Sequence, residues 1–63
     1  MKTFTEREEQ VLQRIVQGKQ NKAIAKELGI AEGTVKVHVS TAMARLNVSN
    51  RTAAAVAYLA MAA

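Results

Sequence analysis

The chain has no cysteine, proline, aspartate or tryptophan, and its only aromatic side chains are Phe4 and Tyr58. The absence of cysteine excludes disulfides, thiolate metal sites and cysteine nucleophiles, and the single histidine is too little for a zinc site. Because aromatic residues are scarce, the core must consist of aliphatic side chains and alanine. This composition favours packed helices over a β-sandwich.

Long apolar runs are also absent. No segment approaches the roughly 20 apolar residues of a membrane span, and the first residues lack the basic-then-apolar layout of a signal peptide. We therefore expect a cytoplasmic protein with no membrane partner. At 63 residues, the chain is long enough for one domain but too short for a deep ligand cavity. We expect a single domain over residues 1–63, with no receiver or ligand-binding domain, no cofactor, no small-molecule ligand and no enzymatic activity.

Positive charge is concentrated in the middle of the chain, which has a formal net charge of +4. Basic and acidic residues cancel over residues 1–17, residues 18–51 hold six basic and two acidic residues, and residues 52–63 hold neither kind. A basic centre suits a polyanionic partner, but many small domains are mildly basic for solubility alone. Charge by itself does not identify the partner.

The spacing of apolar residues predicts four helices, over about residues 6–17, 21–28, 32–46 and 51–60. The first begins after Thr5, because Thr5 and Glu8 match the Thr-x-x-Glu capping box. The three glycines are expected where helices end, Gly18 after the first and Gly29 after the second. The fourth helix is expected to be capped by Ser49 or Asn50.

The second and third predicted helices are separated by only a few residues, from Gly29 to Ala31. A connection this short forces two amphipathic helices to cross steeply, so the predicted fold is a compact all-α four-helix bundle with a helix-turn-helix. The outer face of the third helix has short or flexible side chains, which suit a helix that enters a major groove about 12 Å wide. Its inner face is expected to comprise Val35, Val39, Ala42 and Leu46.

The fourth predicted helix is apolar around its whole circumference. A domain this small cannot bury every side of one helix, so part of that surface is expected to meet a second subunit. For Tyr58 and Leu59, packing within the chain is the alternative to a contact between subunits.

Residues along nearly the whole chain follow one family pattern without a gap. They are Phe4 to Glu8, Val11-Leu12, Gly18, Asn21-Lys22, Ile24-Ala25, Leu28, Ile30, Thr34 to Lys36, His38, Arg45-Leu46, Val48, Arg51-Thr52, Ala54 and Val56. The pattern resembles the LuxR-type helix-turn-helix DNA-binding domain of the NarL/FixJ family of bacterial transcription regulators. No single segment is diagnostic, but more than a dozen positions in register make a specific signal.

The resemblance implies that the third helix enters the major groove of double-stranded DNA and that the fourth helix forms a homodimer on a pseudo-palindromic site. Lys36, Val37 and Ser40 would face base edges, lysine toward guanine acceptors and valine toward a thymine methyl. The expected contacts with the DNA backbone are Asn21, Lys22, Thr34, His38, Arg45 and Arg51. The expected dimer interface comprises Val56, Tyr58 and Leu59.

The chain departs from the family pattern at several positions, among them Ala42, where the family has a larger aliphatic side chain. Some members have lysine or arginine at the position of Ser40, so this departure weakens the transfer of any known target sequence to this chain. Gln20 and Ala31 stand where the family often has a capping serine, so the second and third helices are expected to begin less firmly.

Two other functions share this fold. A sigma-factor C-terminal promoter-reading region has the same helix-turn-helix, but it does not need an alanine-rich, self-complementary fourth helix. A module that sequesters a protein partner would not need Lys22, Lys36 and Arg51, which are all present. A hydrolase or transferase is disfavoured because His38 lacks a cysteine, an aspartate or a second histidine as partner.

Overall fold

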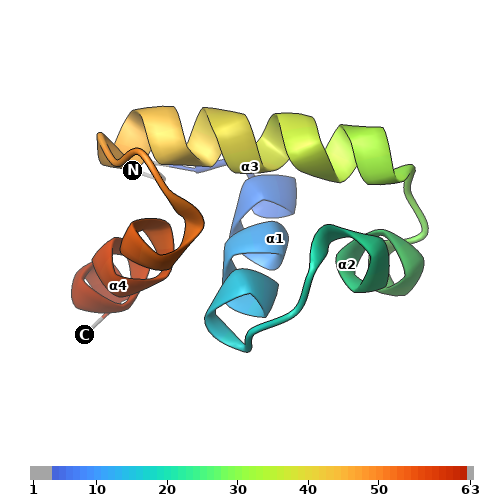
Figure 1. The fold of residues 1–63 in the computed structure, drawn as a ribbon, viewed down its shortest axis with the longest axis horizontal. Helices are drawn as coiled ribbons and strands as arrows, with labels where there is room; N and C mark the ends of the chain where they lie inside the picture. Colours follow the sequence, from blue (N-terminus) through green and yellow to red (C-terminus); the bar gives the residue numbers. More distant parts are fainter. Residues whose placement is uncertain (1–3, 63) are drawn as a thin grey trace.

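The computed structural model describes residues 4–62, which form four helices. Helix α1 spans Glu6–Val16, α2 spans Asn21–Leu28, α3 spans Glu32–Leu46 and α4 spans Arg51–Ala62. In Figure 1, α3 crosses the top of the molecule, α1 lies beneath its middle, and α2 and α4 lie on opposite sides of α1. The predicted all-α fold is confirmed, although α1 ends at residue 16 instead of 17 and α4 continues to residue 62 instead of 60.

The start of α1 is fixed by the predicted capping box. The backbone N–H of Glu8 donates to Oγ1 of Thr5 at 3.1 Å, and the backbone N–H of Thr5 donates to Oε1 of Glu8 at 3.0 Å. Two backbone donors that the helix itself leaves without partners are thereby satisfied. Glu6, Glu8 and Glu9 also place negative charge in the first turn, where the helix dipole favours it.

The helix-turn-helix depends on how α2 ends. Gly29 has φ +68°, a left-handed conformation that glycine adopts without steric cost, and the chain then re-enters a helix at Glu32. Helices α2 and α3 cross instead of running antiparallel (Figure 1). As expected, neither the side chain of Gln20 nor that of Ala31 accepts a capping hydrogen bond from the helix that follows it. The expectation that all three glycines lie where helices end is wrong for Gly33, which is in the first turn of α3.

The core is mostly aliphatic and draws on all four helices. Val11, Leu12, Ile24 and Val35 are completely buried, and burying each such side chain stabilises the fold by roughly 1.5–3 kcal/mol. Val35, Val39 and Ala42 form the buried side of α3, as predicted, and Leu46 packs against the edge of the same cluster. The other core residues are Phe4, Ile15, Ala25 and Ala54.

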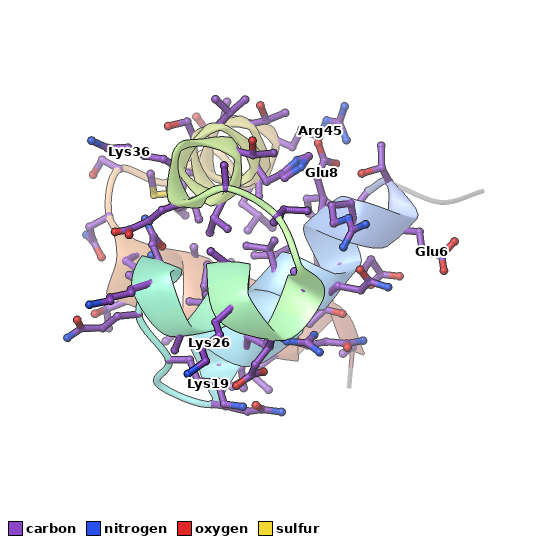
Figure 2. The ribbon with its side chains drawn as sticks, turned by 90° about the vertical axis from the view of Figure 1, so that its right-hand side faces the viewer. Glu6, Glu8, Lys19, Lys26, Lys36 and Arg45 are labelled. Carbon is purple, nitrogen blue, oxygen red and sulfur yellow. The ribbon has the colours of Figure 1, made fainter. Side chains whose placement is uncertain are left out.

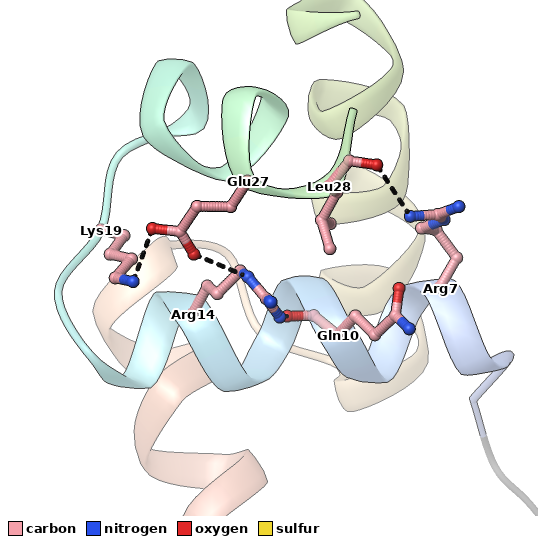
Figure 3. Close-up of polar contacts among 6 residues, drawn as sticks. All are labelled: Arg7, Gln10, Arg14, Lys19, Glu27 and Leu28. Carbon is pink, nitrogen blue, oxygen red and sulfur yellow. Dashed lines mark hydrogen bonds and ion pairs between the residues drawn. The ribbon is translucent and has the colours of Figure 1, made fainter. Parts of the chain in front are cut away.

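Polar contacts tie α2 to α1 (Figure 3). Glu27 on α2 accepts hydrogen bonds from Nε of Arg14 at 3.0 Å and from Nζ of Lys19 at 2.6 Å. Next to Glu27, at the last residue of α2, the guanidinium of Arg7 reaches the backbone oxygen of Leu28 at 3.5 Å. The hydrogen bond from Lys19, supported by Arg14, lowers the pKa of the Glu27 carboxyl below its ordinary value. These contacts hold the C-terminal end of α2, a helix too short to be stable alone.

A second polar contact ties α3 to α1. Glu8 is buried, with only 4% of its surface exposed, and its Oε1 also accepts a hydrogen bond from NH1 of Arg45 near the end of α3. Figure 2 shows the two side chains facing each other, away from Lys36. The carboxylate that caps α1 therefore also fixes the position of the last turns of α3.

We expect Thr5→Ala to lower the free energy of unfolding by about 1 kcal/mol, because it leaves the amide of Glu8 without its capping oxygen. Urea denaturation followed by circular dichroism measures this change. Thr5→Ser retains the hydroxyl and is the matched control, expected to be close to the parent. Equal stability of Thr5→Ala and the parent would contradict the assigned role of the cap.

Candidate nucleic-acid interface

The outer side of α3 is an exposed surface made of short or flexible side chains. Lys36, Val37 and Ser40 are all exposed, and Val37 leaves 63% of its surface uncovered although it is a large apolar residue. With Gly33 and Thr41 they line an open hollow of about 340 Å³. We call these five residues the α3 face. Because the opposite side of α3 is buried in the core, the α3 face is held toward solvent.

The α3 face carries the positive charge of Lys36 and no acidic side chain, since the one acidic residue of α3 is Glu32 in its first turn. Within residues 4–62, the ion pairs engage Arg14, Lys19 and Arg45, and neither Lys36 nor Lys22 belongs to one. In Figure 2, Lys36 lies at the upper side of the molecule, whereas Lys19 and Lys26 lie together below α2. A solvated lysine among short side chains can approach an anionic surface closely.

The structure places the residues expected to contact the DNA backbone in different surroundings. Lys22 and Thr34 are exposed, and Asn21 and His38 are half-buried. Arg45 is instead engaged with the carboxylate of Glu8, a pairing that sequence reasoning did not predict. The signal for it was present, because Glu8 lies at helical spacing with the buried residues that follow it on α1.

Two of these residues, far apart in the sequence, meet in the structure. Arg51, the first residue of α4, donates from NH1 to Oδ1 of Asn21 at 2.7 Å and from NH2 to the backbone oxygen of Lys19 at 2.7 Å. The guanidinium thus joins the start of α4 to the start of α2. It has five N–H donors, so these bonds leave further donors for another partner. Sequence reasoning named both residues but not their contact.

The three residues expected at a dimer interface do not share one environment. Val56 and Leu59 are exposed, by 63% and 53%, whereas Tyr58 turns inward. Its ring meets that of Phe4 edge-on with centroids 6.2 Å apart, and its hydroxyl donates to Oε1 of Glu9 at 2.7 Å. Tyr58 therefore packs within the chain, which was one of the two alternatives weighed for it, and its expected contact with a second subunit stays a prediction. Asn50 caps α4, its Oδ1 accepting from the backbone N–H of Ala53 at 2.8 Å.

Comparison with known proteins decides the family. A model of the GerE family, described as bacterial regulatory proteins of the luxR family, matches residues 2–58. The chain belongs to the LuxR family. It is the helix-turn-helix DNA-binding domain of that family, which is not a class of enzymes.

Individual relatives agree with the LuxR-family model. The chain is 49% identical over 56 residues to the nitrate/nitrite response regulator protein NarP of Escherichia coli, and these cover 89% of this chain and 26% of NarP. It is 47% identical over 58 residues to the spore germination protein GerE of Bacillus subtilis, covering 92% of this chain and 78% of GerE. It thus spans about a quarter of NarP but most of GerE.

The fold also matches a LuxR-family structure. The solved structure of the transcription factor GerE superimposes with a TM-score of 0.92 at 32% sequence identity, covering 98% of this chain and 92% of that chain. The helix-turn-helix expected from sequence is thereby confirmed. Among the described residues, no helix has the length and apolar character needed to cross a membrane, and no group of three potential ligands could hold a metal ion.

In this LuxR-family domain, the hydrogen bond to Glu9, together with burial, raises the pKa of the Tyr58 hydroxyl above its ordinary value of 10.0. The folded state therefore favours the protonated phenol. The stability that this bond contributes is fully present below about pH 10 and is lost as the pH rises through the raised pKa of the folded state.

We expect Tyr58→Phe to lower the free energy of unfolding by about 1 kcal/mol at neutral pH, because it removes the hydroxyl but keeps the contact with Phe4. Above about pH 10 the difference between the parent and the variant should shrink. Denaturation curves of the parent and the variant, measured from neutral pH to above pH 10, test the expectation. Lysine residues also titrate in this range, but they are the same in both proteins, so their effect cancels when the two free energies of unfolding are subtracted. A difference that stays constant with pH would contradict it.

Proposed function

We propose that this domain binds double-stranded DNA in a sequence-specific way, with α3 in the major groove, as the output domain of a bacterial transcription regulator. The observation that carries the proposal is the α3 face, an uncovered helix side with a solvated lysine, a 63% exposed valine and small neighbours. One exposed apolar side chain is ordinary by itself, but here it lies beside a solvated lysine and small neighbours on one side of a helix, a combination that suits contact with base edges. A helix with such a face fits the width of the major groove.

Lys36, Val37 and Ser40 are the proposed base readers. The ammonium of Lys36 donates to O6 and N7 of guanine, the methyl groups of Val37 contact a thymine methyl, and the hydroxyl of Ser40 donates or accepts one turn further along α3. All three line one hollow, so they would meet neighbouring base pairs together. Ser40 is short and neutral, so Lys36 is the charged side chain among the three proposed base readers.

The proposed phosphate contacts flank these readers. Lys22 and Thr34 are exposed near the starts of α2 and α3, and Asn21 lies beside Lys22 with its amide oxygen held by Arg51. His38 and the donors of Arg51 not used within the domain complete the proposed set. Arg45 is the weakest member, because Glu8 already engages its guanidinium. Such contacts fix the register of the protein on the duplex without reading sequence.

Lys36→Ala should weaken binding to the preferred duplex by about 1–3 kcal/mol and relax the choice of base at the position that Lys36 reads. Lys22→Ala should weaken binding to all sequences and reduce the slope of log K against log salt by about 0.9, since one phosphate contact is lost. Fluorescence anisotropy with a duplex selected from a randomised palindrome measures both effects across salt concentrations.

Lys26→Ala removes the same charge from a position outside the proposed contacts and is the matched control, expected to keep the parental slope. A parent that selects no duplex and shows no salt dependence would overturn the DNA-binding proposal. The domain would then be assigned to the class of modules that sequester a protein partner.

We further propose that α4 forms a homodimer when two copies occupy the halves of a pseudo-palindromic site. Val56 and Leu59 supply the contact, since they are exposed apolar side chains on a helix with no charged residue after Arg51. Tyr58 supports this surface from beneath through its contacts with Phe4 and Glu9. A two-fold axis through α4 would place the same patch of each copy against the other.

Leu59→Glu should lower affinity for the palindrome by about tenfold or more, because it brings two carboxylates into an apolar contact. Affinity for a single half-site should stay at the parental value. Gln17→Glu adds the same charge at the exposed end of α1 and serves as the control. Sedimentation of the DNA complex counts the bound copies, and two copies of Leu59→Glu bound with parental affinity would overturn the assignment of α4.

A further inference from the structure

The α3 face contains a glycine that nothing inside the domain requires. Gly33 lies in the first turn of α3, and its φ is not in the left-handed region that Gly18 and Gly29 occupy. A Cβ built on Gly33 would meet no atom within 4 Å apart from its chain neighbours and the backbone of its own helix. Neither backbone conformation nor close packing within the described residues therefore explains the absence of a side chain.

A glycine in a helix has a conformational cost, because it loses more backbone freedom on folding than alanine does. Ala31 at the start of α3 already fails to provide a side-chain cap, so this end of the helix is weakly stabilised. An alanine at position 33 would improve it. The glycine thus opposes the stability of α3, and the reason for it has to lie outside the folded domain.

The position of Gly33 indicates where that reason lies. Three, four and seven residues separate it from Lys36, Val37 and Ser40, the spacing that places residues on one side of a helix. It lines the same hollow as these three side chains. A side chain at position 33 would therefore project from the surface proposed to face DNA, one turn closer to the start of α3.

We propose that Gly33 is a specificity-determining residue, whose missing side chain lets the first turn of α3 lie against the edge of the major groove. When the backbone of this turn lies against the groove, the side chains of Lys36 and Val37 extend far enough into the groove to contact the base edges. A methyl group at position 33 holds the start of α3 away from the groove and withdraws both readers. This inference rests on the proposed function.

The test combines Gly33→Ala and Gly33→Leu with a fluorescein-labelled duplex that the parent selects from a randomised library. Gly33→Ala should raise Tm by roughly 2–8 °C, since a better helix former replaces glycine. It should nevertheless weaken binding to the selected duplex by about tenfold, and Gly33→Leu should weaken it further. The salt slope should stay at the parental value, because no cation is removed.

Gly18→Ala makes the same substitution away from α3, at φ +83°, where a side chain is strained. It should lower Tm and, at a temperature where all variants are folded, bind the selected duplex like the parent. Parental affinity of both Gly33 variants would overturn the role of Gly33 while leaving the proposed function intact. Failure of the parent itself to bind any duplex would overturn the proposed function and this inference with it.

Discussion

Burial of one side of α3 is the constraint on which the rest of this domain depends. The chain has no cysteine, so packing and polar contacts alone hold the fold. Val35, Val39 and Ala42 enter the core at spacings of four and three residues. With 3.6 residues in each turn, this spacing turns Lys36, Val37 and Ser40 to the opposite side. The core and the α3 face are therefore consequences of one helical periodicity.

The carboxylate of Glu8 connects this packing to the polar contacts. A buried carboxylate is costly unless hydrogen-bond donors surround it, and here the amide of Thr5 and the guanidinium of Arg45 both donate to it. Loss of either partner would leave charge insufficiently compensated in the interior. Because Arg45 lies on α3 and Thr5 precedes α1, one side chain sets the start of one helix and the placement of another.

Sequence patterns were sufficient for the helices and for the α3 face, because both depend on local chemistry. The capping box, the left-handed Gly29 and the inward spacing of Val35 and Val39 each involve residues a few positions apart. Contacts between distant residues were missed for the same reason. The meeting of Arg51 with Asn21, and that of Tyr58 with Glu9, depends on how α4 is packed against α1, which no local pattern encodes.

Gly33 was misjudged for a different reason. Glycine usually marks the end of a helix, although the apolar spacing that predicted a helix over residues 32–46 already included position 33, as the backbone conformation confirms. The structure adds detail to the surface of α4 that the sequence pattern does not contain. Its apolar circumference predicted one contact surface, yet the edge-on contact between Tyr58 and Phe4 divides it into an inward side and an outward side.

The elements proposed to meet DNA are stabilised mainly by their neighbours. Helix α2 has eight residues and no side-chain cap, and α3 begins with an uncapped turn that contains a glycine. Helices of this kind are marginal in isolation, so their order comes from α1, through Glu27, Arg7 and the Glu8–Arg45 pair. Because α1 supplies this stability, α2 and α3 do not need capping side chains or strong helix-forming residues of their own. The identity of their exposed residues can therefore depend on what these residues contact.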